Sequence, residues 1–317
     1  MQGPVTGGTA SVLDGANFDP QETSCKFQMT QTAGVYVSRF RFICVTPPMP
    51  AGFVAYELIA GTEVTTYGFQ FHFHARVTVT LLEPPVASPR GGEVVFVNGE
   101  NFMRPAELGQ MADRVSTFCA MGTTTMEEGA FMSSALVACE LLPFPEEADL
   151  AMEVSLNRVD KSSSKVTLRL RDTPELAGVY PWGAPAEGGG TITVMGTPFA
   201  EDTHLGCKLG TLGPVAAMIL SPEEALCVLP SHTPDVVPLT MTNNFHDVAT
   251  HALEFHYRYP AVVEAVFPER GLAGGGTSIV VTGAYFDQGE QPYCRMGAQL
   301  VATDTVQTSF ILSLIHI

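Results

Sequence analysis

Residues 91–102 read GGEVVFVNGENF, which places an alternating apolar run between two glycine turns. Val95 and Val97 are two positions apart, so their side chains face the same side of an extended strand. Gly99 follows seven residues after the glycine pair, and Phe102 follows three residues later. Apolar residues at period two between glycine turns indicate a half-buried β-strand.

This glycine, glycine and phenylalanine spacing occurs four times along the 317 residues, which indicates an internal repeat. The other copies are Gly7-Gly8 with Gly15 and Phe18, Gly188-Gly189 with Gly196 and Phe199, and Gly275-Gly276 with Gly283 and Phe286. The phenylalanines of the last three copies are 97 and 87 residues apart. That period is the length of an immunoglobulin-like β-sandwich, which has roughly 100 residues.

The cysteines follow the same register. A first cysteine comes 7 to 17 residues after the phenylalanine, and in three copies a second follows 19 or 20 residues later. Each second cysteine comes six residues after a serine and shortly before a proline. The first cysteines are Cys25, Cys119, Cys207 and Cys294, and the second cysteines are Cys44, Cys139 and Cys227.

These motifs together resemble the IPT/TIG family of immunoglobulin-like domains, above all at Glu83-Pro84-Pro85 through Phe102 and at Phe267-Pro268 through Phe286. The resemblance implies an all-β protein of tandem immunoglobulin-like β-sandwiches of the E-set type. The expected domains are repeat one (1–75), repeat two (76–172), repeat three (173–259) and repeat four (260–317). No Gly/Ser-rich or Pro-rich linker separates them, so we expect a stiff, rod-like array.

Paired cysteines at this spacing are similar to those of the extracellular members of the family, found in plexins, hepatocyte-growth-factor-receptor-like proteins and fibrocystin-like proteins. The resemblance and the register imply three disulfides, which are Cys25–Cys44, Cys119–Cys139 and Cys207–Cys227. Three such pairs favour an oxidising compartment, although buried free thiols in a cytosolic protein are an alternative. Zinc ligation has less support, because the sequence contains no CxxC.

Both ends of the sequence are expected to be incomplete. Repeat one lacks the strand that precedes the glycine pair in the other copies, and repeat four stops before its second half. Truncation would leave Cys294 unpaired, and residues 312–317 are hypothesised to be foreign to the native continuation. The first residues have neither a charged nor an apolar segment of the kind that signal peptides carry.

Composition excludes some classes of partner. The chain has 33 acidic and 16 basic residues and a formal net charge of −17, which argues against nucleic acid, because phosphate binding relies on Lys and Arg. No apolar run reaches the roughly 18 residues that a membrane helix needs. No nucleophile elbow, P-loop, metalloprotease or EF-hand motif is present. We therefore expect no enzymatic activity, no catalytic residues and no cofactor.

Some residues could still form a site. His72 and His74 share one face of an expected strand and could supply two metal ligands, but we favour a solvated face opposite Phe69, Phe71 and Phe73, and predict no metal site. Trp182, beside Tyr180, could stack on a sugar; we favour packing at the junction of repeats two and three. Residues 160–164 are expected to form a polar hairpin loop.

The leading hypothesis is a non-catalytic extracellular or cell-surface fragment that acts in adhesion or receptor-type recognition of a protein ligand and as a spacer. An array of carbohydrate-binding modules is the alternative, with a glycan as partner. An intracellular Rel-like dimerisation domain is a remote third reading, and the acidic balance argues against it.

Overall fold

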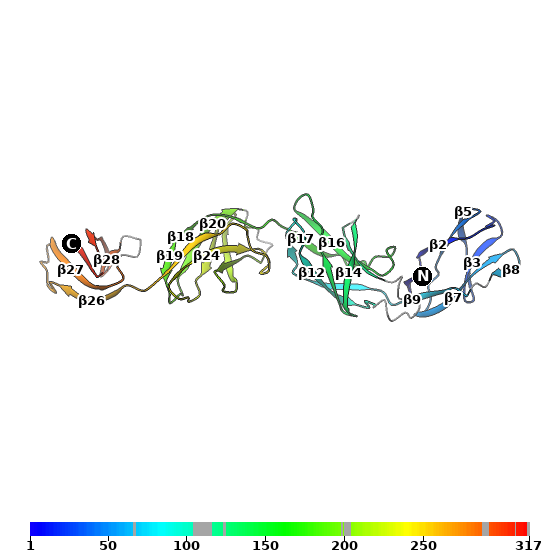
Figure 1. Ribbon diagram of the computed structural model, residues 1–317, viewed down its shortest axis with the longest axis horizontal. Coiled ribbons are helices and arrows are strands. Elements are labelled where there is room, and N and C mark those ends of the chain that lie inside the picture. The colour runs from blue at the N-terminus through cyan, green and yellow to red at the C-terminus, as the bar shows by residue number, and fades with distance from the viewer. Residues whose placement is uncertain are drawn as a thin grey trace. The chain divides into compact units, whose positions relative to one another are not determined.

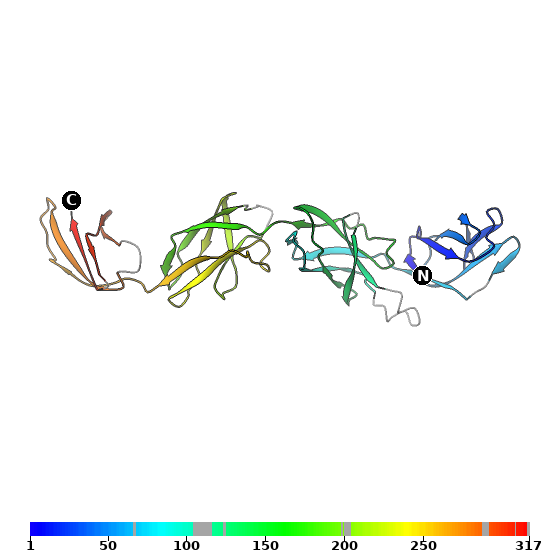
Figure 2. The ribbon, with the colours of Figure 1, turned by 45° about the horizontal axis from the view of Figure 1, so that its top comes forward.

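The computed structural model describes residues 1–65, 68–103, 116–122, 125–197, 199, 204–286, 292–307 and 309–315. Within these ranges the chain forms strands joined by turns and loops, with no helix, as expected for an all-β fold. The chain divides into two compact units, Met1–Asp172 and Thr173–Ile317. Figures 1 and 2 show that each sandwich is built from one continuous stretch of sequence.

Repeat two forms a sandwich whose two layers share one strand. The pairing order is β10-β12-β15-β14-β13-β16-β17-β11. The second half of β14 pairs with β15 in one layer, and its first half pairs with β13 in the other. The strands are β10 (Thr78–Glu83), β11 (Val86–Ala87), β12 (Val94–Glu100), β13 (Thr117–Met121), β14 (Thr125–Ser133), β15 (Leu136–Glu140), β16 (Ala148–Ser155) and β17 (Val166–Leu170).

Repeat three has the same pairing order, strand for strand: β18-β20-β23-β22-β21-β24-β25-β19. In both repeats the shortest strand pairs in parallel with the last one, and the other pairs are antiparallel. The strands are β18 (Glu175–Tyr180), β19 (Gly183–Pro185), β20 (Thr191–Thr197), β21 (Gly206–Leu209), β22 (Val215–Ser221), β23 (Glu224–Val228), β24 (Asp235–Thr242) and β25 (Leu253–Arg258).

Repeat one has one layer of β2-β6-β5 and a second of β1-β9-β7-β3-β4, with β8 also paired to β7. Among its described residues, no strand corresponds to β10 or β18, so β2 is an edge strand. The strands are β1 (Gln2–Pro4), β2 (Ala10–Asp14), β3 (Thr23–Phe27), β4 (Thr30–Thr32), β5 (Gly34–Ser38), β6 (Arg41–Val45), β7 (Gly52–Ala60), β8 (Glu63–Thr65) and β9 (Gln70–His74).

Repeat four forms the sheet β26-β27-β31-β30 and the hairpin β28-β29. Residues 312–315 lie in β31, which pairs with β27, whereas residues 316 and 317 lie outside the described residues. The strands are β26 (Val262–Phe267), β27 (Thr277–Ala284), β28 (Tyr293–Met296), β29 (Gln299–Ala302), β30 (Thr305–Val306) and β31 (Phe310–Ile315).

The repeated serine has a local structural role. The hydroxyl oxygens of Ser38, Ser133 and Ser221 each accept a hydrogen bond from the backbone N–H two residues later, at 3.2 Å in all three. Each bond lies in the turn of the hairpin that leads into the strand with the second cysteine. Serine favours such turns because its hydroxyl can replace a backbone acceptor. The fixed serine-to-cysteine spacing is therefore the distance along the chain from the hairpin turn to the cysteine in the next strand.

The glycine pair lies against the backbone at the proline that follows the second cysteine. Gly91 has φ +72°, and a Cβ at this position would lie 2.6 Å from the backbone nitrogen of Pro143. Gly188 has the same φ, and a Cβ there would lie 2.6 Å from the carbonyl carbon of Pro230. Positive φ and close backbone approach are both conditions that only glycine meets without strain. The repeat therefore preserves glycine where two backbone segments touch.

Candidate binding groove

The structure places the predicted cysteines in the repeat cores. Disulfides join Cys25 to Cys44, Cys119 to Cys139 and Cys207 to Cys227, with Cα–Cα distances of 5.9, 5.9 and 6.3 Å. Each bond links the strand after the phenylalanine loop to a strand of the opposite layer, and all six cysteines are fully buried. Cys294 is a buried free thiol in β28.

His72 and His74 do not both lie on a solvated face. His74 is only 6% exposed, so the expectation of a solvent-facing histidine is wrong at this position. Phe71 and Phe73 are buried as predicted, whereas Phe69 is half exposed because it precedes β9. Strand alternation assigns residues to faces, but it does not reveal whether a loop covers a face.

The surroundings of His74 favour a neutral imidazole. Its Nδ1–H donates to the carbonyl oxygen of Ala75 at 2.8 Å, and its Nε2 is buried without a hydrogen-bond partner among the described residues. Burial lowers the pKa of His74, with opposing contributions from the Ala75 hydrogen bond and the Asp160 carboxylate. Burial and the neighbouring His74 lower the pKa of His72 as well. In the described part of the chain, no three His, Cys, Asp or Glu side chains gather to hold a metal ion.

Trp182 packs on its own repeat. The guanidinium carbon of Arg258 lies 3.8 Å from the centre of the Trp182 ring, and His256 meets the ring edge-on at 4.7 Å. Both partners are in β25 of repeat three. This cation–π contact lies within repeat three, and a role of Trp182 at the junction with repeat two stays a prediction. A guanidinium on the ring also occupies a face that a sugar would need.

The loop at residues 157–164 does more than connect two strands. Asn157 Nδ2 donates to the carbonyl oxygen of Gln2 at 2.9 Å, and the Thr9 hydroxyl donates to Asp160 at 2.6 Å. Gln2 and Thr9 are both buried. The expected polar hairpin loop of repeat two therefore contacts repeat one within the unit Met1–Asp172.

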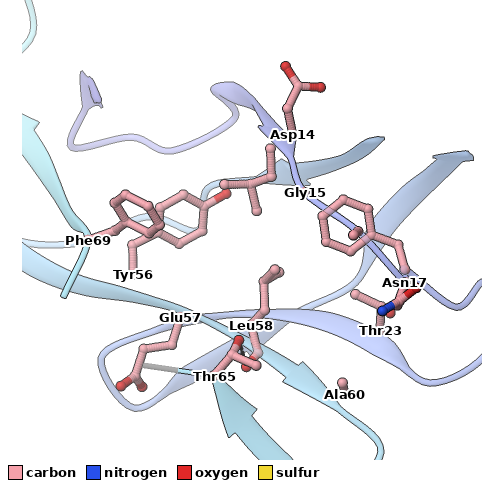
Figure 3. A pocket seen from close by; sticks show the side chains of 13 residues that line it. Asp14, Gly15, Asn17, Thr23, Tyr56, Glu57, Leu58, Ala60, Thr65 and Phe69 are labelled. Carbon is pink, nitrogen blue, oxygen red and sulfur yellow. Dashed lines mark hydrogen bonds between the residues drawn. The ribbon is translucent and has the colours of Figure 1, made fainter. Parts of the chain in front are cut away.

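Repeat one contains an apolar groove of about 350 Å³ beside the free edge of β2. Figure 3 shows Leu58 pointing into the space between β2 and β7, with Gly15 on the opposite side and the Asp14 carboxylate directed away. The side chains that define the groove are Leu13, Phe18, Tyr56, Leu58 and Phe69.

The carboxylates near the groove are already engaged. Asp14 pairs with Arg41 at 2.7 Å, and the hydrogen bond from Arg41 lowers the pKa of Asp14. Glu57 pairs with Lys26 at 2.9 Å. Burial raises the pKa of Tyr56 to about 12, so its hydroxyl stays protonated at neutral pH. The groove is therefore an apolar surface whose neighbouring carboxylates are paired with basic side chains.

The comparisons with known proteins agree with this architecture. The IPT/TIG domain family matches residues 1–73, 174–257 and 261–313, which together exceed half of the chain. Residues 74–173 are outside that match, yet repeat two has the strand order of the matched repeat three. Among the described residues, no helix has the length and apolar character needed to cross a bilayer.

Curated relatives are distant and much longer. The chain is 23% identical to mouse fibrocystin-L over 263 residues, covering 76% of this chain and 5% of fibrocystin-L. It is 22% identical to rat plexin-A3 over 241 residues, covering 74% of this chain and 12% of plexin-A3. The plexin A4 extracellular region aligns with all of this chain and 34% of its own length, at 13% identity and a TM-score of 0.42. By its family match, its repeat architecture and its disulfides, this chain belongs to the IPT/TIG domain family, as a tandem array of the extracellular type.

Proposed function

We propose that this chain is a recognition and spacing segment of a longer cell-surface receptor or adhesion protein, and that its ligand is a protein. The disulfides and the relationship to plexin and fibrocystin-L repeats point to an extracellular repeat region. The chain spans 5% and 12% of the length of those relatives, so the ligand of the whole protein is part of this proposal.

One observation supports the proposal most strongly. Each of repeats one to three has a fully buried disulfide between its layers, which makes a small sandwich rigid without a cofactor. Rigid sandwiches present loops and sheet edges as recognition surfaces. We further propose that the domain boundaries fall near residues 75, 172 and 259, where the sheets of one repeat end and those of the next begin.

A cell-adhesion assay tests this function. The protein, made in a secretory host, would be displayed at high density on beads and offered to cells before and after protease treatment of the cell surface. We expect binding that protease abolishes and that enzymatic removal of glycans preserves. Reduced and alkylated protein on identical beads is the matched control, because it has the same composition without the folded surfaces.

Two results would contradict the proposal. Adhesion that survives protease but disappears after glycan removal would replace the protein ligand with a carbohydrate. Equal adhesion of folded and reduced beads would show that the folded repeats recognise nothing in the assay.

A further inference from the structure

The exposed apolar side chains in the strands of repeat two gather on one of its two layers. Four large apolar side chains of β10, β12 and β14 are 41 to 57% exposed, namely Leu81, Val94, Phe96 and Met132. The strands β13, β16, β17 and β11 of the other layer have no exposed large apolar side chain among their described residues. Single exposed apolar residues are common on proteins, but their concentration on one layer indicates a contact surface. We call this surface the β12 face.

The strand register makes the residues of the β12 face neighbours. Phe96 in β12 lies opposite Ala138 in β15, and Ala138 lies opposite Ala130 in β14. The Phe96 ring therefore stands beside two small side chains. Leu81 lies opposite Asn98, which is the next residue of β12 on the same side as Phe96. Side chains directly opposite one another are about 5 Å apart at Cβ, so the surface is continuous across the sheet.

The charged residues in the strands of the β12 face are all acidic. Glu83 lies opposite Phe96 from β10, and Glu140 lies opposite Val94 from β15, so an exposed carboxylate flanks β12 on each side. β10, β12, β14 and β15 contain five glutamates and no Lys, Arg or His. Within the described part of the chain, the ion pairs involve other carboxylates. Both glutamates are therefore available to an external basic group.

The same layer of repeat three is apolar but lacks this acidic flank. Tyr180 and Val228 are paired with β20 in the positions that Glu83 and Glu140 occupy beside β12. Tyr180 is 71% exposed and Val228 is 55% exposed. An apolar outer surface on this layer is therefore shared by repeats two and three, whereas the pair of flanking carboxylates distinguishes repeat two.

We propose that the β12 face binds a protein partner whose apolar contact residues are flanked by Lys or Arg side chains. The apolar residues would form the buried centre of the contact, and Glu83 and Glu140 would pair with the basic groups at its rim. A second copy of this chain does not fit, because two identical faces would bring together carboxylates with no basic strand residue between them. The proposal rests on the protein ligand proposed above and specifies where it binds and by what chemistry.

A peptide titration tests this chemistry. The probe is a fluorescein-labelled amphipathic helix built only from leucine and lysine, with a leucine stripe flanked by lysines. It is titrated with the full chain and followed by fluorescence anisotropy, and saturable binding is expected. The matched control peptide has glutamate in place of every lysine. It should bind more than about tenfold more weakly, because its charges have the same sign as those of the β12 face.

Substitutions of apolar residues locate the binding on the β12 face. Phe96→Ser should weaken binding of the lysine peptide about tenfold, because the contact no longer buries the phenylalanine ring. Leu81→Ser is a second variant with the same expected direction, so the test does not depend on one substitution. The matched control is Phe40→Ser, since Phe40 is 52% exposed but lies in the turn between β5 and β6 of repeat one.

Charge reversal tests the acidic flank separately. The double variant Glu83→Lys, Glu140→Lys should bind the lysine peptide about tenfold more weakly at low ionic strength, because attraction is replaced by repulsion. The matched control is Glu63→Lys, Glu187→Lys, which has the same net charge and changes exposed residues of repeats one and three. Retained disulfides and an unchanged circular dichroism spectrum would establish that each variant is folded.

Three results would overturn the proposal: no saturable peptide binding, equal binding of the two peptides, or equal binding by the face variants and their controls. The bead assay separates the site from the function. If beads with the unaltered chain and with the Phe96→Ser chain adhered to cells equally, the site would be wrong and the proposed function would stand. If the unaltered chain did not adhere, the proposed function would fail, and the peptide titration would still decide whether the β12 face recognises apolar and basic groups.

Discussion

Gly99 occupies the position in repeat two where the backbone of β10 comes closest to β12. An added Cβ would overlap the carbonyl oxygen of Thr78 and would lie 2.6 Å from the Phe102 ring. Strand backbone cannot move aside as a flexible side chain can, so we expect Gly99→Ala to destabilise repeat two by about 1–3 kcal/mol. Hydrogen exchange of β12 amides would measure the change within that repeat.

Gly213→Ala is the control for that substitution. A Cβ at Gly213 would meet no atom within 4 Å, and its φ is not in the left-handed region. We expect exchange in repeat three to be nearly unchanged. If Gly99→Ala proved equally neutral, the close approach of β10 to β12 would be refuted.

The histidines of β9 predict a pH dependence. Burial lowers the pKa of His74 below its ordinary value of 6.5, so the unfolded chain binds a proton more readily than the folded chain. Between the folded-state pKa and about 6.5, the free energy of unfolding therefore rises with pH. The contribution of neutral His74 to the free energy of unfolding of repeat one should be fully present above pH 6.5. It should decrease as the pH falls from 6.5 toward the folded-state pKa.

His74→Gln tests the origin of this dependence. The variant has no titrating ring, so its stability should change less between pH 7 and pH 5 than that of the unaltered chain. Denaturant unfolding followed by exchange of β9 amides provides the measurement. His72→Gln is the matched comparison, because its side chain is in the same strand and its pKa is also lowered. Unchanged acid sensitivity in both variants would contradict the assignment.

At the scale of elements, a disulfide joins the two layers of the sandwich in each of repeats one to three. Cys119 in β13 and Cys139 in β15 close a loop of 20 residues. In the chain-entropy account a loop of this length stabilises the folded state by about 3 kcal/mol. Replacing both cysteines with alanine should lower the free energy of unfolding of repeat two by roughly that amount, measured by denaturant titration. A loss far below 1 kcal/mol would mean that the bond does not constrain the unfolded chain.

The loop between β16 and β17 is the element that joins repeats one and two. Asp160→Ala would leave the buried Thr9 hydroxyl without its acceptor, which should cost about 1–3 kcal/mol. Faster hydrogen exchange at residues 2–9 would report the loss. Asp247→Ala is the control, because Asn244 and Asp247 form the same turn in repeat three, with an Nδ2 to Oδ2 distance of 2.7 Å in both turns. Equal exchange at residues 2–9 in the two variants would contradict a contact between the repeats.

At the scale of the whole molecule, the sequence predicts the fold well because its signals are local and repeated. Gly91 allows two backbone segments to approach, Ser133 stabilises a hairpin turn, and Cys139 forms a disulfide in the core. Each of these roles is set by residues of the same repeat. Four copies of one spacing make such signals unambiguous. The same reasoning correctly indicates an all-β tandem array and the IPT/TIG family.

The site is harder to predict because it depends on what covers a surface. The groove of repeat one depends on how Leu58 and Phe18 pack beside β2, and the pattern of apolar residues does not specify that packing. His74 is buried close to Asp160, which lies more than 80 residues later in the sequence, and periodicity carries no information about such a neighbour. The contact of Trp182 with Arg258 likewise joins residues far apart in the sequence, which strand periodicity does not predict.

The protein is a tandem array in which disulfides close repeats one to three, as favoured by an oxidising compartment. Intact mass spectrometry after thiol alkylation under denaturing conditions, with and without prior reduction, tests it most directly on protein from a secretory host. One modified thiol, Cys294, is expected without reduction and seven are expected after reduction. Seven modified thiols without reduction would contradict the disulfides and, with them, the extracellular assignment.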